Sequence, residues 1–340
     1  MTAHEASRTT TVLIAASLML ALILPLFAPS YYVQFASKAM LMGMLALSLN
    51  LVVGFGGLVS MCHAAFFGLG GYMLAFLSPE SAGASVWLSL PVAVAVVAVV
   101  AAAIGALSLR TRGIYFIMVT LAFGEMLFYF FHDTKIGGGS DGLYIYFKPE
   151  LALGGLTLID LESKRAFYYV VLALLVSAVL LVRGLVRSPF GHALAAARDN
   201  ERRALSLGFP VFRVRILAFV ISAMIAGVAG YFSAAQFGFV APQLLGWHLS
   251  ATVLVMVVLG GMSSILGPVL GAFALIGLEE LLKSSFEHWK LIKGLVIIAL
   301  VFALPGGLQQ LAQMLRAPDG PKEADPTPSH APSTEAASHV

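Results

Sequence analysis

The chain has few of the residues that a water-soluble protein needs on its surface. Only 11% of its 340 residues are charged, whereas a soluble domain carries about 25%. Hydrophobic residues make up 59% of the chain, and its mean hydropathy is +0.93. This composition excludes a soluble domain and indicates a membrane protein. The net charge of +3 is too small and too dispersed for a surface that binds nucleic acid.

Several kinds of active site are excluded by what is missing. The single cysteine, Cys62, excludes an internal disulfide and a cysteine-based zinc site. No Gly-Lys dipeptide occurs, so the chain has no phosphate-binding loop of the GxxxxGK[ST] kind. HExxH and CxxC are also absent. We interpret His63, beside Cys62, as a hydrogen-bonded structural residue, and we expect no catalytic residue, metal or cofactor in this chain.

Long apolar runs predict an all-α integral membrane protein, a polytopic bundle of about ten transmembrane segments. A spanning helix needs about 20 mostly apolar residues, because its backbone must be hydrogen-bonded internally in lipid. The third run contains Gly68, Gly70 and Gly71, which predict a broken or re-entrant element. The predicted segments are 11–28, 39–54, 62–78, 86–109, 113–131, 166–183, 216–236, 249–266, 268–283 and 291–305.

Arginines predict the orientation of these segments. The connection between Arg183 and Arg215 holds seven arginines against two acidic residues, which places it in the cytoplasm. The turn with Arg110 and Arg112 lies two crossings earlier and faces the same side. Both termini are then cytoplasmic. The predicted organisation is a cytoplasmic N-terminus (1–10), a transmembrane domain (11–315) with an external loop (132–165) and a cytoplasmic coupling region (184–215), and a disordered, proline-containing cytoplasmic tail (316–340).

Two polar residues inside predicted spans are candidates for a translocation path. Glu125 is the only ionisable residue of its 19-residue run, and a charge at that depth is costly unless it faces protein or water. Glu125 either lines a polar path or makes a structural hydrogen bond between helices, and the sequence does not decide between the two. Asn50 is a weaker candidate of the same kind, because an uncharged amide is cheaper to bury.

Small residues predict where helices pack closely. Spacing of four residues between small side chains lets membrane helices approach one another, as in the segment SAMIAGVAG, which contains Ser222, Gly227 and Gly230. A second group surrounds Pro268, where a bend or tight turn is expected because proline removes a backbone donor. Its glycines are Gly260, Gly261 and Gly267.

The arginine-rich connection also has a helical pattern. Residues 193–207 form a helix-compatible run that ends at Gly208, the residue type expected at a helix C-terminus, and Pro210 prevents continuation. Orientation alone does not require such a capped helix. We therefore expect a short cytoplasmic helix that contacts anionic lipid or a partner protein.

The sequence AAARDNERRALSLGFPVFRVRILAFVISAMIAGVAG resembles the coupling region and following helix of the membrane subunits of branched-chain amino acid ABC transporters, the LivM-type permeases. Three further blocks agree: GLVSMCHAAFFGLGGY, RGIYFIMVTLAFGEMLF followed by GGGSDGL, and VLGGMSSILGPVLGA. By matching position, the resemblance assigns coupling to Arg198, Asn200, Glu201 and Gly208, and Arg202 lies in the same stretch. Arg202 and Arg203 replace smaller or apolar residues of the family pattern, which puts the details of the docking surface in doubt.

The resemblance implies a bacterial inner-membrane importer. Its expected partners are a second permease subunit, two ATP-binding subunits that carry ATP and Mg²⁺, and a periplasmic substrate-binding protein. This chain would then be a non-enzymatic, multi-pass conduit for branched-chain amino acids, other amino acids, amides or urea.

Two other readings of the residues compete. One is a self-contained secondary transporter or channel with Glu125 as its ion or proton site, although no inverted repeat is visible. The other is a membrane-embedded transferase or hydrolase, for which Glu279 and Glu280 are the nearest approach to an acidic cluster but lack a third partner.

Overall fold

Helices form almost all of the regular structure. The computed structural model describes residues 19, 21–79, 83–153, 156–262, 264–285, 287–303 and 307. Six helices in these ranges are long and apolar enough to cross a membrane. The chain is therefore an all-α, multi-pass membrane protein. The six stretches are Ser30–Phe55, Val86–Ser108, Ile114–Asp133, Lys164–Arg187, Val211–Phe237 and Pro242–Gly260.

The first stretch contains two kinds of helix. It is an α-helix, α2 (Ser30–Asn50), that continues as a π-helix, η1 (Leu51–Phe55). α2 begins nine residues before the predicted segment 39–54, directly after Pro29, whose fixed φ and missing N–H suit a helix start. The other five stretches contain α4 (Val86–Ser108), α5 (Ile114–Asp133), α6 (Lys164–Arg187), α9 (Val211–Phe237), and η4 (Pro242–Leu244) with α10 (Trp247–Gly260).

Three further apolar helices match predicted segments but are shorter or more charged. They are α3 (His63–Leu77), α11 (Gly267–Ser285) and α12 (Trp289–Ala303). Most of the predicted segment 11–28 lies outside the described residues, as do the predicted N-terminus 1–10 and the tail 316–340. The count of ten and the side on which the termini lie stay predictions.

The third predicted segment, 62–78, is not broken at its glycines. α3 runs unbroken through Gly68, Gly70 and Gly71, and the non-helical stretch, 57–62, precedes it. These glycines let other chain segments come close: a Cβ added at Gly70 would lie 2.1 Å from the carbonyl oxygen of Gly227. The glycines therefore serve packing, and the break in the helix lies before them.

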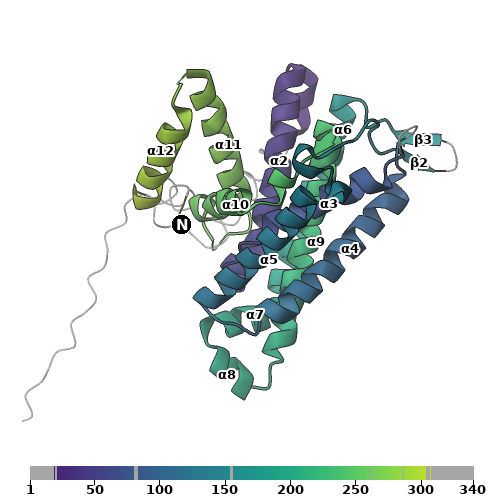
Figure 1. Ribbon diagram of the computed structural model, residues 1–340. Helices are drawn as coiled ribbons and strands as arrows, with labels where there is room; N and C mark the ends of the chain where they lie inside the picture. The colour runs from purple at the N-terminus through teal and green to yellow at the C-terminus, as the bar shows by residue number, and fades with distance from the viewer. Residues whose placement is uncertain are drawn as a thin grey trace, which may run out of the picture.

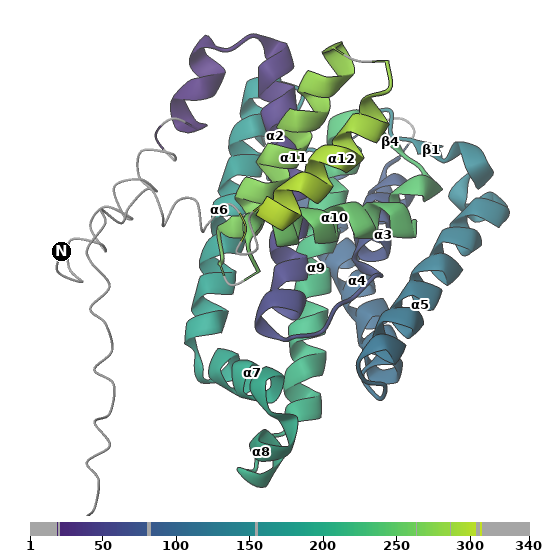
Figure 2. The ribbon, with the colours of Figure 1, turned by 90° about the vertical axis from the view of Figure 1, so that its left-hand side faces the viewer.

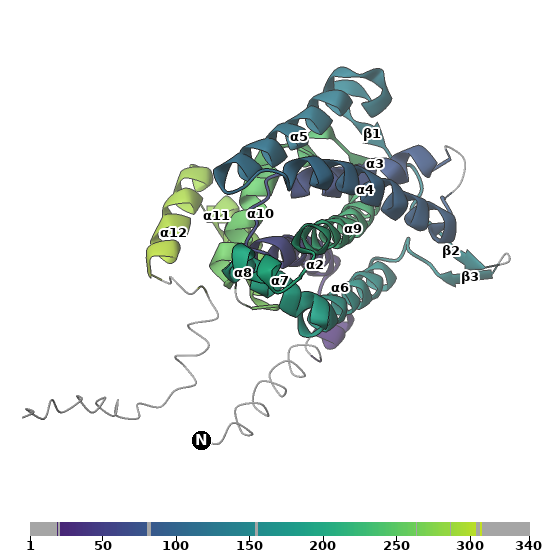
Figure 3. The same cartoon turned by 90° about the horizontal axis from the view of Figure 1, so that it is seen from below.

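The centre of the bundle is formed by α2, α3 and α9. Seen from below, α2 and α9 lie in the middle, with α3, α4 and α5 on one side and α6 on another (Figure 3). A Cβ added at Gly230 of α9 would lie 1.7 Å from the carbonyl oxygen of Phe67. The backbones of α3 and α9 are thus in direct contact. α11 and α12 pack beside α10 (Figure 2).

The two ends of the bundle carry different structures (Figure 1). One end holds two short helices, α7 (Pro189–Asp199) and α8 (Glu201–Ser206). At the other end β1 (Leu143–Tyr144) pairs antiparallel with β4 (Phe239–Val240), which joins the predicted external loop 132–165 to the connection between α9 and α10. The same end holds the hairpin of β2 (Leu151–Leu153) and β3 (Leu156–Ile159), with the short helices η2 (Lys135–Gly137) and η3 (Gly139–Asp141) earlier in that loop.

Candidate functional site

The predicted coupling helix is two helices. The sequence predicts one helix over 193–207, whereas α7 ends at Asp199 and α8 begins at Glu201. Asn200 separates them in an extended conformation and caps α8, because its Oδ1 accepts from the N–H of Arg203 at 3.0 Å. The prediction of one helix is wrong because the backbone of Asn200 is extended and the N–H of Arg203 bonds to the Asn200 side chain instead of to a helical carbonyl. Gly208, with φ of +84°, follows α8 where a left-handed residue is needed.

Glu201 anchors this region to the rest of the protein. Its carboxylate contacts Arg215 at the start of α9 (3.0 Å) and Arg112 in the turn between α4 and α5 (2.9 Å). Arg215 also donates to the carbonyl of Ala197 at 3.1 Å. The Arg112 pair places both arginine-bearing connections at one end of the bundle. Glu201 is therefore engaged inside the chain, and its side chain is 23% exposed.

The outer surface of this end is partly apolar. We call residues 202–209 on α8 and its exit the α8 surface. Arg202 and Arg203 are exposed there, together with Leu205, Leu207 and Phe209. Leu207 is 69% exposed. Sequence reasoning singled out the arginines and missed the apolar residues, although apolar side chains in a polar loop are the visible signal for them. Arg198 is also exposed but donates to the carbonyl of Gly54 in η1 at 2.7 Å.

Glu125 makes a contact between helices. Its Oε1 accepts a hydrogen bond of 3.1 Å from the backbone N–H of Trp247, the first residue of α10. The first N–H groups of a helix have no partner within it, and a carboxylate is favourable at that end. The structure thus contains a hydrogen bond between helices, which is one of the two roles that the sequence predicts for Glu125.

Asn50 lies fully buried at the junction of α2 and η1. Its Nδ2 donates to the carbonyl of Ser264, in the turn between α10 and α11, at 2.8 Å. Its Oδ1 has no hydrogen-bond partner among the described residues. Asn50 and Glu125 therefore bind different segments: Asn50 binds the α10–α11 turn, and Glu125 binds the start of α10.

The small-residue segments lie at close backbone contacts. Gly227 faces Val97 of α4, with an added Cβ 3.0 Å from that side chain. Gly260 and Gly267 face each other so closely that a Cβ on Gly260 would lie 1.9 Å from the carbonyl oxygen of Gly267. Gly261 has φ of +105° and ends α10, and Pro268 lies in the first turn of α11. The predicted turn at Pro268 is thus the tight α10–α11 connection.

A chain of hydrogen bonds surrounds His63 in the centre of the bundle. Its Nε2 lies 2.7 Å from Ser222 Oγ, and its Nδ1 lies 3.1 Å from Ser60 Oγ. Because the Ser222 hydroxyl donates to the carbonyl of Ser48, Nε2 is the protonated nitrogen and Nδ1 accepts from Ser60. The directions are consistent throughout, which agrees with a structural role for His63. Ser222 is therefore a hydrogen-bonding residue as well as a small one.

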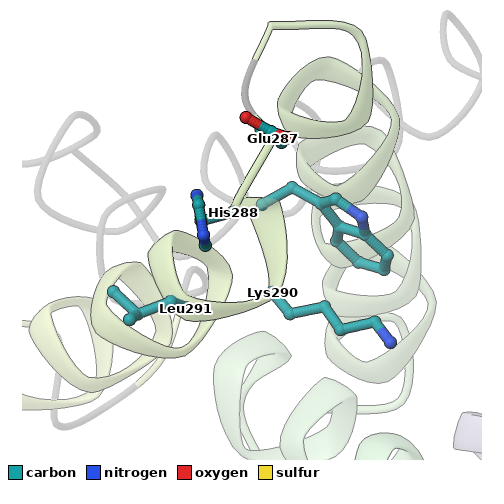
Figure 4. A pocket seen from close by; sticks show the side chains of 5 residues that line it. Glu287, His288, Lys290 and Leu291 are labelled. Atoms are coloured by element: carbon teal, nitrogen blue, oxygen red, sulfur yellow. The ribbon is translucent and has the colours of Figure 1, made fainter.

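Two further observations concern ligand sites. Among the described residues, no group of three His, Cys, Asp or Glu side chains could hold a metal ion. A shallow hollow of about 420 Å³ lies at the turn between α11 and α12, lined by Glu287, His288, Trp289, Lys290 and Leu291 (Figure 4). It contains none of the predicted site residues and lies far from α7 and α8 along the bundle (Figure 1).

Comparison with known proteins decides the family. A family model described as "Branched-chain amino acid transport system / permease component" matches residues 31–302. The chain belongs to this family of permease components. It is 33% identical over 321 residues to the high-affinity branched-chain amino acid transport system permease protein LivM of Escherichia coli strain K12, which covers 87% of this chain and 74% of that protein.

Other relatives are similar over different lengths. The LivM protein of Salmonella typhimurium strain LT2 is 33% identical over 319 residues, which covers 86% of this chain and 73% of that protein. The autoinducer 2 import system permease protein LsrC of Klebsiella pneumoniae is 40% identical over 155 residues, 42% of this chain and 44% of that protein. No solved structure gives a significant match. The names of these relatives therefore give different cargoes.

Proposed function

We propose that this chain is one permease subunit of an ATP-driven importer in a bacterial inner membrane, which moves branched-chain or related amino acids inward. A second permease subunit completes the path, a periplasmic binding protein delivers the substrate, and two ATP-binding subunits supply the energy. The family membership and the similarity to the two LivM proteins support this cargo class.

The observation that carries the docking part of the proposal is the α8 surface. It lies at one end of the bundle (Figure 2). It exposes leucine and phenylalanine side chains beside two arginines. Exposed apolar patches with a polar rim are typical of protein interaction sites. The ion pairs of Glu201, the side-chain cap of Asn200 and the turn at Gly208 hold this surface in one orientation. A movement of the α8 surface is therefore transmitted to the bundle.

The mechanism needs no covalent step in this chain. Closure of the ATP-binding subunits moves α7 and α8, and helices that pack through small residues shift between two discrete arrangements. The contacts between α3 and α9 and between α10 and α11 are the tightest of this kind. The substrate then passes between the permeases without being modified.

The test is reconstitution of the whole complex. The chain is co-expressed with a second permease and the ATP-binding subunits encoded with it, and the complex is placed in liposomes with the binding protein on the substrate side. Uptake of leucine, isoleucine, valine, other amino acids, an amide and urea is measured with and without ATP. We expect ATP-dependent uptake of at least one branched-chain amino acid. Accumulation by this chain alone, driven by an ion gradient, would instead establish a secondary transporter.

A further inference from the structure

α7 rests on η1 through two side chains one helical turn apart. Leu194 and Arg198 are spaced i, i+4 and therefore share a face of α7. Leu194 is buried and lies next to Gly56, with its Cδ1 3.5 Å from the position of an added Cβ. Arg198 donates from Nη1 to the carbonyl of Gly54 at 2.7 Å. This face of α7 thus meets the last turns of the long helix that α2 and η1 form (Figure 3).

The guanidinium of Arg198 is held in a fixed orientation. Its Nε and Nη2 both lie 3.0 Å from Oδ1 of Asp199, which leaves Nη1 for the carbonyl of Gly54. The side chain passes over Gly57, where an added Cβ would lie 2.5 Å from Arg198 Cγ and where φ is +67°. The planar arginine fork makes three contacts at once, which lysine cannot reproduce. The glycine at 57 provides the space for it.

η1 in turn contacts the interior of the bundle. A Cβ added at Gly54 would lie 2.2 Å from the carbonyl oxygen of Met262 and 2.3 Å from Asn50 Oδ1. Asn50, directly before η1, donates to the carbonyl of Ser264. The segment therefore lies between Arg198 on one side and the α10–α11 turn on the other. Any displacement of η1 must also displace Asn50 or that turn.

η1 is the irregular turn of this helix. A single π-helical turn interrupts the regular hydrogen bonding of a helix and is common at functional sites. Beside it, Asn50 Oδ1 is buried and lacks a donor within the described part of the chain. An unpaired buried acceptor is costly, so a shift of η1 that brings a donor to this oxygen is favoured.

We propose that Arg198 is a positioning residue that transmits the movement of α7 to η1, and through η1 to Asn50 and the α10–α11 turn. The proposal rests on the proposed function, because it assumes that partner subunits move α7. It gives Arg198 a different task from the one that the family resemblance implies. Arg198, although exposed, bonds to the end of the helix that α2 and η1 form, while the α8 surface meets the partner.

The experiment compares Arg198→Met with Arg198→Lys in the full complex. Methionine keeps the length of the side chain but has no donor, whereas lysine can still donate to the carbonyl of Gly54. Arg183→Met, an exposed arginine on α6, is the matched control. Three readouts are taken: retention of the ATP-binding subunits, ATP-driven uptake, and hydrogen exchange of the peptide 51–58 with and without nucleotide.

We expect the Arg198→Met complex to keep its ATP-binding subunits and to lose uptake by about tenfold or more, the scale of one charge-assisted hydrogen bond. Arg198→Lys recovers part of that loss, and Arg183→Met behaves as wild type. The nucleotide-dependent change in exchange at 51–58 occurs in wild type and disappears in Arg198→Met. A merely structural role for Arg198 would not remove the nucleotide response selectively.

Three results would overturn the proposal. They are normal uptake in Arg198→Met, a wild-type nucleotide response at 51–58 in that variant, and loss of the ATP-binding subunits, which would make Arg198 a docking residue. If the wild-type complex shows no ATP-driven uptake, the proposed function fails instead. The contact between Arg198 and Gly54 can then still be tested in the purified chain. The N–H groups of Gly57 and Leu58 bond to the carbonyls of Val53 and Val52. In Arg198→Met these two N–H groups must exchange faster than in wild type.

Discussion

Gly230 offers a direct test of the packing between α3 and α9. In the substitution Gly230→Ala, the new methyl group would lie 1.7 Å from the carbonyl oxygen of Phe67 and 2.5 Å from its carbonyl carbon. Both are backbone atoms, so no side-chain rotation relieves the overlap. Ordinary contact needs about 3.5 Å, and α3 and α9 must therefore separate by more than 1 Å or tilt.

The cost follows from what else holds these two helices together. Residues 63 and 222 are linked by the His63–Ser222 hydrogen bond, and Gly70 lies against Gly227 on the same contact. A separation at Gly230 weakens both. Overpacking of a tight interior costs about 1–3 kcal/mol, and we expect the upper part of that range because the obstacle is backbone.

The assay uses the only cysteine of the chain as a reporter. Cys62 is fully buried next to His63, so a thiol-reactive fluorophore labels it only when the bundle opens on heating. Gly230→Ala should label at a temperature several degrees lower than wild type. Gly277→Ala is the matched control, because a Cβ at Gly277 of α11 meets nothing within 4 Å and alanine favours a helix by about 1 kcal/mol. Equal labelling temperatures for Gly230→Ala and wild type would refute the close packing of α3 on α9.

Four further substitutions test the coupling end and the interior. Glu201→Gln removes the partner of the largely buried Arg215, so we expect several-fold faster tryptic cleavage within α8; Arg112→Gln should change it little, because that pair is exposed and contributes at most about 1 kcal/mol. Glu125→Gln keeps an oxygen acceptor for the N–H that begins α10, so the complex should assemble and transport normally, and loss of uptake would show that the charge is needed. Leu207→Glu should reduce co-purification of the ATP-binding subunits at least tenfold while the labelling temperature of Cys62 stays unchanged; intact co-purification would place the docking surface elsewhere.

The sequence is informative where one physical requirement acts over many residues. Long apolar runs locate the spanning helices because lipid leaves the backbone few alternatives. The arginine-bearing connections were predicted to lie on the same side of the membrane, and the ion pair between Arg112 and Glu201 places them at the same end of the bundle. Small residues at regular spacing lie at real close contacts, as Gly227 and Gly230 show. Each of these features depends on local composition alone.

The sequence fails where two distant residues decide the outcome. Residues 193–207 suit a helix throughout, and the break at Asn200 depends on its side-chain cap and on the Glu201 anchors in α9 and the α4–α5 turn. The glycines at 54, 56 and 57 indicate that something approaches closely, but nothing local names Arg198 as the partner. The π-helical turn likewise has no local signature that we could read. The contact between Arg198 and Gly54 joins residues 144 positions apart in the sequence.

Three polar residues of the spanning helices accept hydrogen bonds from backbone N–H groups at or near the start of other helices. The non-helical segment before α3 has backbone donors inside the bundle, and Thr120 of α5 accepts from the N–H of Met61 at 3.2 Å. Ser250 of α10 accepts from the N–H of Ala64 at 3.1 Å. Glu125 does the same for the first residue of α10.

The physical reason is that irregular backbone is tolerated in a membrane only where protein groups satisfy it. A polar side chain in a spanning helix therefore has a structural use whenever another helix begins or ends beside it. This requirement accounts for Thr120, Ser250 and Glu125 without a polar path. Asn50 fits this explanation only in part. Its Nδ2 donates at the α10–α11 turn, but its Oδ1 has no donor within the described residues. Asn50 is thus the polar residue of this set whose present contacts do not explain it, and it lies beside η1, the segment that Arg198 holds.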